Sequence, residues 1–451
     1  MTAASHRVDT NTLRRGTCPS IAAPMQTGDG LLVRLRPVSA ALSAQDLLVL
    51  ADLARRHGNG LIEITARGNI QLRGLTDASV PRLAADLAAA GIETRTGVAI
   101  EVPPLSGVDP SEIADATPIA DALRSAIAAA ALTLAPKLAI VVDGGGVLSL
   151  SDMVADIRLD AIETNEGALW RLAIGGDRET ARSVALLPSD AVIDGTMAVV
   201  SALAAAGPAT RGRDLDVPTL SANLSEGDKG QEAISWFKSG PRHPVGKHHI
   251  GGRLVLGVAP AYGQVHADRL AALVQSLSAC GAVEFRLAPH RTLLVCGLSE
   301  EGLAAAQGAA EREGFWCTDK APGRSVSICA GAAGCASASF DTHAAADAVV
   351  AHAAGLLDGS VDIHISGCPK GCAHPARAAV TLCGTADGVG LVLNGKASDP
   401  ALATVPADGF VPAIQRLGAL LRNRRAESET AKSLLDRTAP DTIVSAYRGH
   451  Q

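Results

Sequence analysis

Aromatic side chains are scarce in this sequence, whose 451 residues include three Trp, two Tyr and five Phe. Large rings therefore cannot fill its interior, and packing must rely on Ala, Leu and Val. Because 47% of the residues are hydrophobic, the chain can still bury substantial cores, and its length suits about three domains. We expect a globular protein of several domains.

A strong excess of either charge is also missing, since the net charge is only −6. Proteins that bind nucleic acid usually carry a basic surface, so this balance gives that class no support. An anionic ligand would have to be met by local arginines. We therefore expect no nucleic-acid partner.

Long hydrophobic runs are absent as well. The most membrane-like stretch, residues 125–142, is interrupted by Pro136 and Lys137, which argues against a membrane span. Residues 1–25 contain three arginines but no apolar run before Cys18, unlike a secretory signal. We expect no membrane association.

Cysteine, in contrast, is present in a pattern. Four of the nine cysteines form two pairs in Gly-rich segments, Cys329-x5-Cys335 and Cys368-Pro-Lys-Gly-Cys372. Four thiolates that glycine backbone can approach closely suit an iron–sulfur cluster. Structural zinc usually uses shorter Cys spacings, and buried free thiols would explain one or two of these residues rather than four.

The other five cysteines have no paired spacing, and we interpret them as core or incidental thiols. They are Cys18, Cys280, Cys296, Cys317 and Cys383. Because no regular disulfide framework is visible, we expect a reducing compartment, the cytoplasm.

The chain repeats one order of elements, β-α-β-β-α. The first copy is predicted at residues 30–37, 44–57, 61–65, 70–73 and 78–91, and the second at 252–260, 267–280, 283–287, 292–296 and 303–314. Two such ferredoxin-like units, each with an exposed sheet edge, are expected to join around a pseudo-two-fold axis. A longer mixed α/β stretch follows each unit.

The prediction is therefore an α+β protein made of two pseudo-symmetric halves. Its parts are a first ferredoxin-like unit (20–95), a first α/β domain (96–225), a polar linker (226–249), a second unit (250–316) and an iron–sulfur α/β domain (317–430). From Arg425 onward the sequence is polar and is expected to end in a surface helix and tail. The segment 143–146, Asp-Gly-Gly-Gly, lacks the dinucleotide spacing and is interpreted as a tight turn after a buried strand.

The repeated units and the C-x5-C…C-x3-C motif resemble the sulfite/nitrite reductase superfamily over residues 18–421. Within it, residues 18–31, 136–146 and 364–375 are most similar to the precorrin-3B synthases of aerobic cobalamin biosynthesis. That resemblance implies a 4Fe-4S cluster and a macrocycle held between the two halves. It also implies an oxygen-dependent hydroxylation of precorrin-3A with lactone formation, and an additional mononuclear non-haem iron.

The departures from the reductases are informative too. Sulfite reductases hold their oxyanion with two arginines and two lysines, and here Arg67 and Lys137 match the first of each, which makes them the candidate catalytic residues. Ala139 stands at the second lysine position, and residues 97–102 offer Glu101 instead of a second arginine. Half of the oxyanion cage is missing, which argues against a six-electron reduction of sulfite.

Candidate substrate-binding residues lie on the first unit. Alternation places Arg34 and Arg36 on one face of a strand, where guanidinium groups can pair with acetate and propionate, although a solvated face is the alternative. The full set is Arg34, Arg36, Asn69, Gln71 and Arg73, with Lys247, His248 and His249 as further pocket candidates.

Candidates for ligands of a mononuclear iron are Glu101, Asp362, His364 and His374. For His364 a structural role, with its hydrogen bonds satisfied, is the favoured interpretation.

Two rival functions stay open. One is a sirohaem-dependent sulfite or nitrite reductase, and the other is a tetrapyrrole-binding or electron-transfer protein without catalysis. Since the chain has no dinucleotide fingerprint, electrons are expected from an NAD(P)H-dependent reductase or a ferredoxin-like partner.

Overall fold

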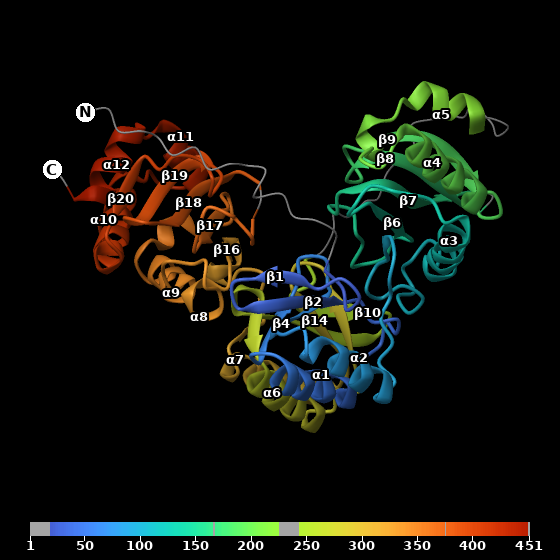
Figure 1. Ribbon diagram of the computed structural model, residues 1–451, viewed down its shortest axis with the longest axis horizontal. Coiled ribbons are helices and arrows are strands. Elements are labelled where there is room, and N and C mark those ends of the chain that lie inside the picture. Colours follow the sequence, from blue (N-terminus) through green and yellow to red (C-terminus); the bar gives the residue numbers. More distant parts are fainter. Residues whose placement is uncertain (1–18, 166, 225–242, 375, 450–451) are drawn as a thin grey trace.

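A computed structural model describes residues 19–165, 167–224, 243–374 and 376–449. The two ferredoxin-like units form one central body, and a mixed α/β domain lies on each side of it (Figure 1). Among the described residues no helix has the length and apolar character needed to cross a bilayer.

The first unit has the predicted order of elements. Its members are β1 (Met25–Thr27), β2 (Gly30–Leu35), α1 (Ala44–His57), β3 (Leu61–Ile64), β4 (Ile70–Leu75) and α2 (Ser79–Ala89). Helix α1 begins where it does because Ser43 and Asp46 form a capping box that satisfies the free amide groups of the first turn.

The second unit repeats this order, with β12 (Gln264–His266) as an extra strand before its first helix and β15 (Phe315–Trp316) as an extra strand at its end. Its other members are β10 (Gly246–Ile250), β11 (Arg253–Pro260), α6 (Ala267–Ala279), β13 (Glu284–Ala288), β14 (Thr292–Leu298) and α7 (Glu300–Arg312). Most of the expected linker, 226–249, lies outside the described residues. Its last four residues are not linker but strand, because residues 246–250 pair antiparallel with β11.

The two units exchange backbone hydrogen bonds. Strand β12 of the second unit pairs with β3 and completes the first sheet, whose order is β1-β2-β4-β3-β12. Reciprocally, Leu42 of the first unit forms two 2.8 Å hydrogen bonds with Phe285 on β13. Helices α1 and α6 bury Leu47, Leu50 and Leu273 in one common core. This exchange confirms the predicted pseudo-two-fold joining.

The outer domains share one topology. The first contains β5 (Ala99–Glu101), α3 (Thr117–Ala130), β6 (Ala139–Asp143), β7 (Ala155–Thr164), β8 (Gly167–Gly176), β9 (Arg182–Pro188), α4 (Val192–Ala206) and α5 (Val217–Leu224). The second contains β16 (Val326–Ile328), α8 (Gly331–Gly334), α9 (Thr342–His352), β17 (Ile363–Ser366), β18 (Ala378–Thr385), β19 (Gly388–Gly395), β20 (Ala403–Val405), α10 (Phe410–Arg424), α11 (Ala431–Arg437) and α12 (Pro440–Arg448). In both sheets the strands follow one another in sequence order. The first three strands are parallel to one another, and the fourth and the fifth each pair antiparallel with the strand before them. The predicted α+β fold of two halves is confirmed.

The C-terminal segment is not the expected surface tail. Helix α12 buries Ile443 and Tyr447, which are 2% and 0% exposed. The Tyr447 hydroxyl donates a 3.0 Å hydrogen bond to the Val389 carbonyl on β19. Because the apolar face of α12 covers the sheet, the domain continues to the end of that helix.

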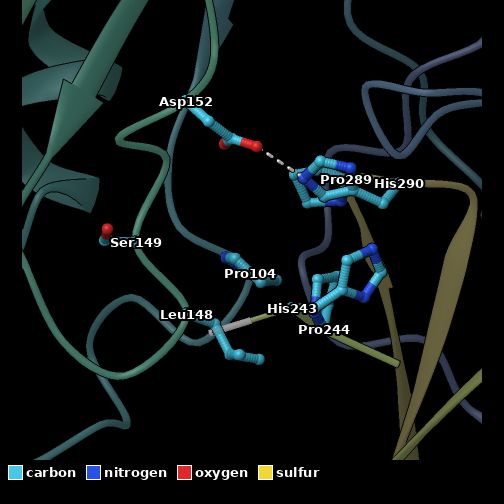
Figure 2. A pocket seen from close by; sticks show the side chains of 8 residues that line it. All are labelled: Pro104, Leu148, Ser149, Asp152, His243, Pro244, Pro289 and His290. Carbon is cyan, nitrogen blue, oxygen red and sulfur yellow. Dashed lines mark ion pairs between the residues drawn. The ribbon is translucent and has the colours of Figure 1, made fainter. Parts of the chain in front are cut away.

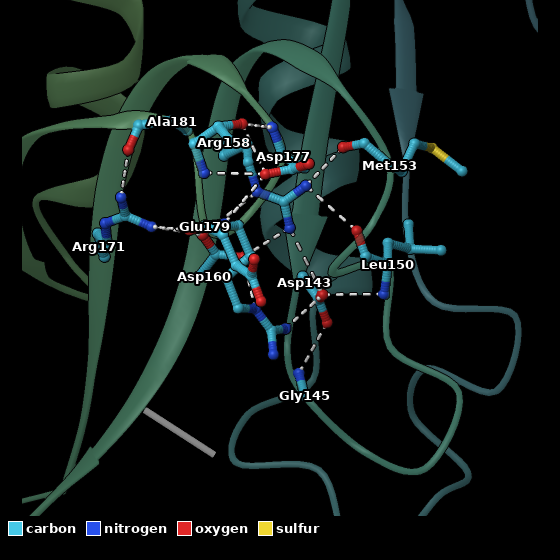
Figure 3. A network of polar contacts seen from close by, with 12 residues as sticks. Asp143, Gly145, Leu150, Met153, Arg158, Asp160, Arg171, Asp177, Glu179 and Ala181 are labelled. Carbon is cyan, nitrogen blue, oxygen red and sulfur yellow. Dashed lines mark hydrogen bonds and ion pairs between the residues drawn. The ribbon is translucent and has the colours of Figure 1, made fainter. Parts of the chain in front are cut away.

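A buried network of ion pairs lies at the end of β6, where the tight turn was expected (Figure 3). Asp143 accepts hydrogen bonds from the Gly145 and Leu150 amides and from Arg178 at 2.7 Å. Arg158, which is fully buried, donates to Asp160 at 2.7 Å. Burial raises the pKa of Asp143, and the arginines oppose that effect. The turn is thus anchored by charges that have no access to water.

A second acidic group lies in the loop that covers this turn. The Val147 amide donates to Asp109 at 2.7 Å, and Glu112 forms a backbone bridge with Gly145. Burial, reinforced by Asp115 and Asp109, raises the pKa of Glu112 to about 7. The folded protein therefore holds a proton on Glu112 that the unfolded chain releases near its ordinary pKa of 4.5.

Glu112→Gln is expected to stabilise the first α/β domain at pH 8. A raised carboxyl pKa costs stability as the pH rises from about 4.5 through 7, and the amide removes that cost, about 1 to 2 kcal/mol for a partly exposed group. Calorimetric melting at pH 5 and pH 8 checks this, with exposed Glu163→Gln as the control. An equal gain at both pH values would contradict it.

Candidate functional site

A cavity of about 550 Å³ lies between the first ferredoxin-like sheet and the cysteine loops. One wall carries Arg34, Glu63, Gln71 and Arg73 from β2, β3 and β4, with Arg67 from the hairpin between β3 and β4. All four cysteines of the motif line the opposite wall. The second unit contributes Gln264 and Arg291.

The cysteines converge because of the way the last domain folds. Strands β16 and β17 are parallel neighbours, so Cys329 and the 368–372 loop leave the sheet at the same edge. The Gly367 amide donates to the Cys329 sulfur at 3.1 Å. A Cβ atom on Gly28 would lie 2.6 Å from the Cys335 sulfur, so only glycine lets this backbone approach the thiol.

The donor set, four thiols on one wall of the cavity, is of the kind that holds an iron–sulfur cluster. Burial raises the pKa of Cys368, and the nearby thiols Cys372, Cys329 and Cys335 raise it further, as expected of thiols that face one another without a metal charge. No group of three or more His, Cys, Asp or Glu side chains among the described residues closes around one metal ion.

The predicted arginine set forms a network on the opposite wall. Arg34 donates to the Gln71 side-chain oxygen at 2.7 Å, and Gln71 in turn donates to Glu63. Arg73 pairs with Asp29 at 2.8 Å and with Glu63 at 3.3 Å. Burial lowers the pKa of Arg73, but Glu63 and Asp29, with a smaller effect of Cys335, outweigh it and raise the pKa.

Three predicted residues lie outside the cavity lining. The strand ends at Leu35, and Arg36 turns to donate to the Gly97 carbonyl at 2.7 Å. Asn69 is buried in the hairpin between β3 and β4. Lys137 is exposed before β6, with φ at 63°. Alternation along a strand could not predict these positions, because all three residues lie in turns or at strand ends.

Arg67 does reach the cavity. One of its terminal nitrogens, Nη2, donates to the Val154 carbonyl at 2.7 Å, and the other, Nη1, is buried without a partner among the described residues. Behind it, burial raises the pKa of Glu101, while the charge of Arg67 is the strongest opposing influence. The cavity thus presents a guanidinium with unused hydrogen-bonding capacity, backed by a carboxyl group.

The four candidate iron ligands do not come together. Asp362 is exposed, and Glu101 lies in the other outer domain beside Arg67. His364 and His374 have ring centroids 5.6 Å apart. His364 is fully buried, and neither ring nitrogen has a partner within the described chain, so the interpretation as a satisfied structural histidine is wrong. Burial, and then His374, lower its pKa to about 4.

The candidates next to the linker also lie outside the cavity, because they belong to β10, an edge strand of the second unit's sheet. His248 is buried with its ring 2.9 Å from the Pro244 carbonyl, and Lys247 and His249 are exposed. None of the three lines the cavity.

A smaller pocket of about 90 Å³ lies where four segments meet (Figure 2). His290 forms a 2.9 Å ion pair with Asp152 of the first α/β domain, and its ring centroid is 4.7 Å from that of His243. Burial, and then the charge of Arg324, lower the pKa of His243 to about 3. These contacts fasten the outer domain to the central body beside the hairpin that carries Arg291.

Sequence reasoning missed Asp29, Glu63, Gln264 and Arg291. Asp29 is recognisable only once β2 and β4 are paired, since it lies 44 residues from Arg73 in sequence. Glu63 lies on the neighbouring strand of the same hairpin as Arg73. Arg291 had a usable signal, because it occupies the β13–β14 hairpin, the counterpart of the β3–β4 hairpin that carries Arg67.

Residues 23–90 match the family model of the nitrite/sulfite reductase ferredoxin-like half domain. The chain is 44% identical over 440 residues to a precorrin-3B synthase of a Sinorhizobium species, covering 96% of this chain and 95% of the relative. It is 24% identical to a ferredoxin–nitrite reductase of Synechococcus elongatus, over 81% of this chain and 80% of that one.

Among solved structures, the NirA protein of Mycobacterium tuberculosis superimposes with a TM-score of 0.69 at 20% identity, covering 92% of this chain and 84% of that one. This likeness shows the fold. Together with the identity over nearly the whole length of the Sinorhizobium relative, it places the protein: the chain belongs to the precorrin-3B synthase family, within the sulfite/nitrite reductase superfamily.

Proposed function

We propose that this protein converts precorrin-3A to precorrin-3B by an oxygen-dependent hydroxylation with lactone formation. The observation that carries the proposal is a cavity that has four cysteines on one wall and arginines on the other. A precorrin carries many acetate and propionate groups, and guanidinium groups bind carboxylates with paired hydrogen bonds. The 44% identity to a precorrin-3B synthase supports this substrate.

The reaction takes up one oxygen atom into the macrocycle. The other oxygen atom of O2 leaves as water, which requires two electrons and two protons. We infer that an external donor, an NAD(P)H-dependent reductase or a ferredoxin-like protein, supplies the electrons. The 4Fe-4S cluster held by Cys329, Cys335, Cys368 and Cys372 would pass them on one at a time.

The residues of this chain bind and orient the substrate. Arg34 is held in position by the neutral side chain of Gln71, so its charge is preorganised for a carboxylate at the macrocycle rim. The charge of Arg73 is already paired with Asp29 and Glu63, which makes Arg73 a support of this wall. Glu101 lies in the stretch, residues 97–102, where a reductase would place its second arginine. Since it adds a carboxyl group beside Arg67, it weakens the site for a small oxyanion.

Aerobic incubation with precorrin-3A and a reductant tests the proposal. We expect a product heavier by one oxygen atom, and 18O2 should label it. The rival reductase predicts a sharp visible band of an iron-bound macrocycle in the purified protein, with reduction of sulfite or nitrite, whereas a broad cluster absorption alone favours the synthase. Binding of precorrin-3A without any labelled product would favour a carrier.

A further inference from the structure

Two hairpins, one from each ferredoxin-like unit, meet at the cavity. The hairpin between β3 and β4 carries Arg67, and the hairpin between β13 and β14 carries Arg291. The His290 amide donates a 2.9 Å hydrogen bond to the Ala66 carbonyl. A Cβ atom on Gly68 would lie 2.8 Å from the Ala288 carbonyl carbon, so the two turns are in direct contact. The pseudo-two-fold relation therefore brings one arginine from each half to the same cavity.

The position of Arg291 requires an unusual backbone. His290 and Arg291 have φ angles of 57° and 63°, in the left-handed region that side chains rarely adopt. Gly263, at φ +81°, makes room for the Arg291 side chain, because a Cβ atom there would lie 2.4 Å from its Cδ. Such strained positions persist when the surrounding structure holds them, and they cluster at ligand-binding sites.

The charge of Arg291 has no direct partner in the part of the chain that the structure describes. Among the described residues it forms no hydrogen bond or ion pair, and burial lowers its pKa against the weaker opposing effect of Glu63. Glu63 is already engaged by Gln71, Arg73 and Gln264. The charge of Glu63 is therefore already neutralised by other residues, and it does not explain why a positive charge is placed at Arg291. A largely buried guanidinium without a partner is costly, unless a ligand supplies the missing anion.

We propose that Arg67 and Arg291 form a two-sided clamp for carboxylate groups of the ligand, with one arginine from each half. The identity of that ligand as a precorrin rests on the function proposed above. Nη1 of Arg67 has no partner among the described residues, Arg291 forms no hydrogen bond or ion pair with any of them, and both arginines line the same cavity. A tetrapyrrole carries carboxylates around its whole rim, so a clamp from two sides would fix the orientation of the macrocycle over the cysteine wall.

The test is an anaerobic titration without an electron donor, which measures binding alone. Arg291→Met and Arg67→Met should each weaken the affinity for precorrin-3A about 10- to 100-fold, since each loses charge-assisted hydrogen bonds. Arg291→Lys, which keeps the charge but not the paired geometry, should recover part of the loss. Arg312→Met, at an exposed arginine of α7 in the same unit, is the matched control and should bind as the wild type does.

Two further measurements separate a loss of ligand binding from misfolding and from a wrong choice of ligand. Unchanged cluster absorbance and circular dichroism identify a binding effect rather than misfolding, and the Lys variant serves if the Met variant does not fold. Titration with uroporphyrin, which has eight carboxylates, separates the two proposals: loss of uroporphyrin binding in Arg291→Met supports the clamp even if precorrin-3A is not the substrate. Wild-type affinity for both ligands in folded Arg291 variants would overturn the clamp.

Discussion

Replacing Cys368 by Ser is expected to remove iron and acid-labile sulfide together and to abolish hydroxylation of precorrin-3A. Cys368 lies at the edge of the sheet where the other three thiols converge, and its pKa responds to all of them. A hydroxyl is a much poorer ligand for iron than a thiolate. Iron and sulfide analysis, with the visible spectrum, measures the loss.

Cys383 provides the matched control for this experiment. It lies next in the sheet, on β18, and burial, followed by Cys368 and Cys329, raises its pKa to about 12. Cys383 is therefore close to the four proposed ligands, but it does not line the cavity. Cys383→Ala should keep full cluster content. Equal loss in both variants, or full retention in Cys368→Ser, would contradict the ligand assignment.

Arg158→Met should destabilise the first α/β domain by about 3 to 5 kcal/mol, because it leaves Asp143 and Asp160 with too little positive charge in a site that water does not reach. Arg158 also donates to the Leu150 and Met153 carbonyls at 3.1 and 2.6 Å, and these acceptors would lose their partner. Thermal or urea unfolding of the purified protein measures the effect.

The control is an exposed ion pair of the same kind. Arg56, whose side chain is 51% exposed, pairs with Asp52 at 2.7 Å, and Arg56→Met should cost less than about 1 kcal/mol because water screens the pair. A cost for Arg158→Met as small as that for Arg56→Met would mean that the buried network adds nothing to stability.

The sequence predicted the repeated units and the convergent cysteines because both depend on local signals. Apolar periodicity predicts strands and helices, such as the helix at 44–57. The paired Cys spacing in Gly-rich loops can be recognised in the sequence without knowledge of the fold. The expectation of a polar tail failed at Tyr447, because burial of α12 depends on a sheet far away in sequence.

The arginine wall was predicted only in part. Strand parity predicted that Arg34 and Arg36 share one face, and Arg34 does line the cavity, but parity could not show that the strand ends before Arg36. Asp29 becomes visible as a partner only when the non-local pairing of β2 with β4 is known, whereas Glu63 lies opposite Gln71 in the local β3–β4 hairpin. Arg291 required the further step of superimposing one half on the other.

The exchange of β12 between the halves has a consequence for biosynthesis. The free edge of β3 is completed by residues 264–266, which leave the ribosome some 200 residues after residues 61–63, and at roughly 5 to 20 residues per second that delay lasts at least about ten seconds. During this time the edge and half of the common core are exposed, which invites association with other chains. Because the cysteines come later still, the cavity forms only when synthesis is nearly complete, and the cluster must be inserted into a finished or almost finished chain.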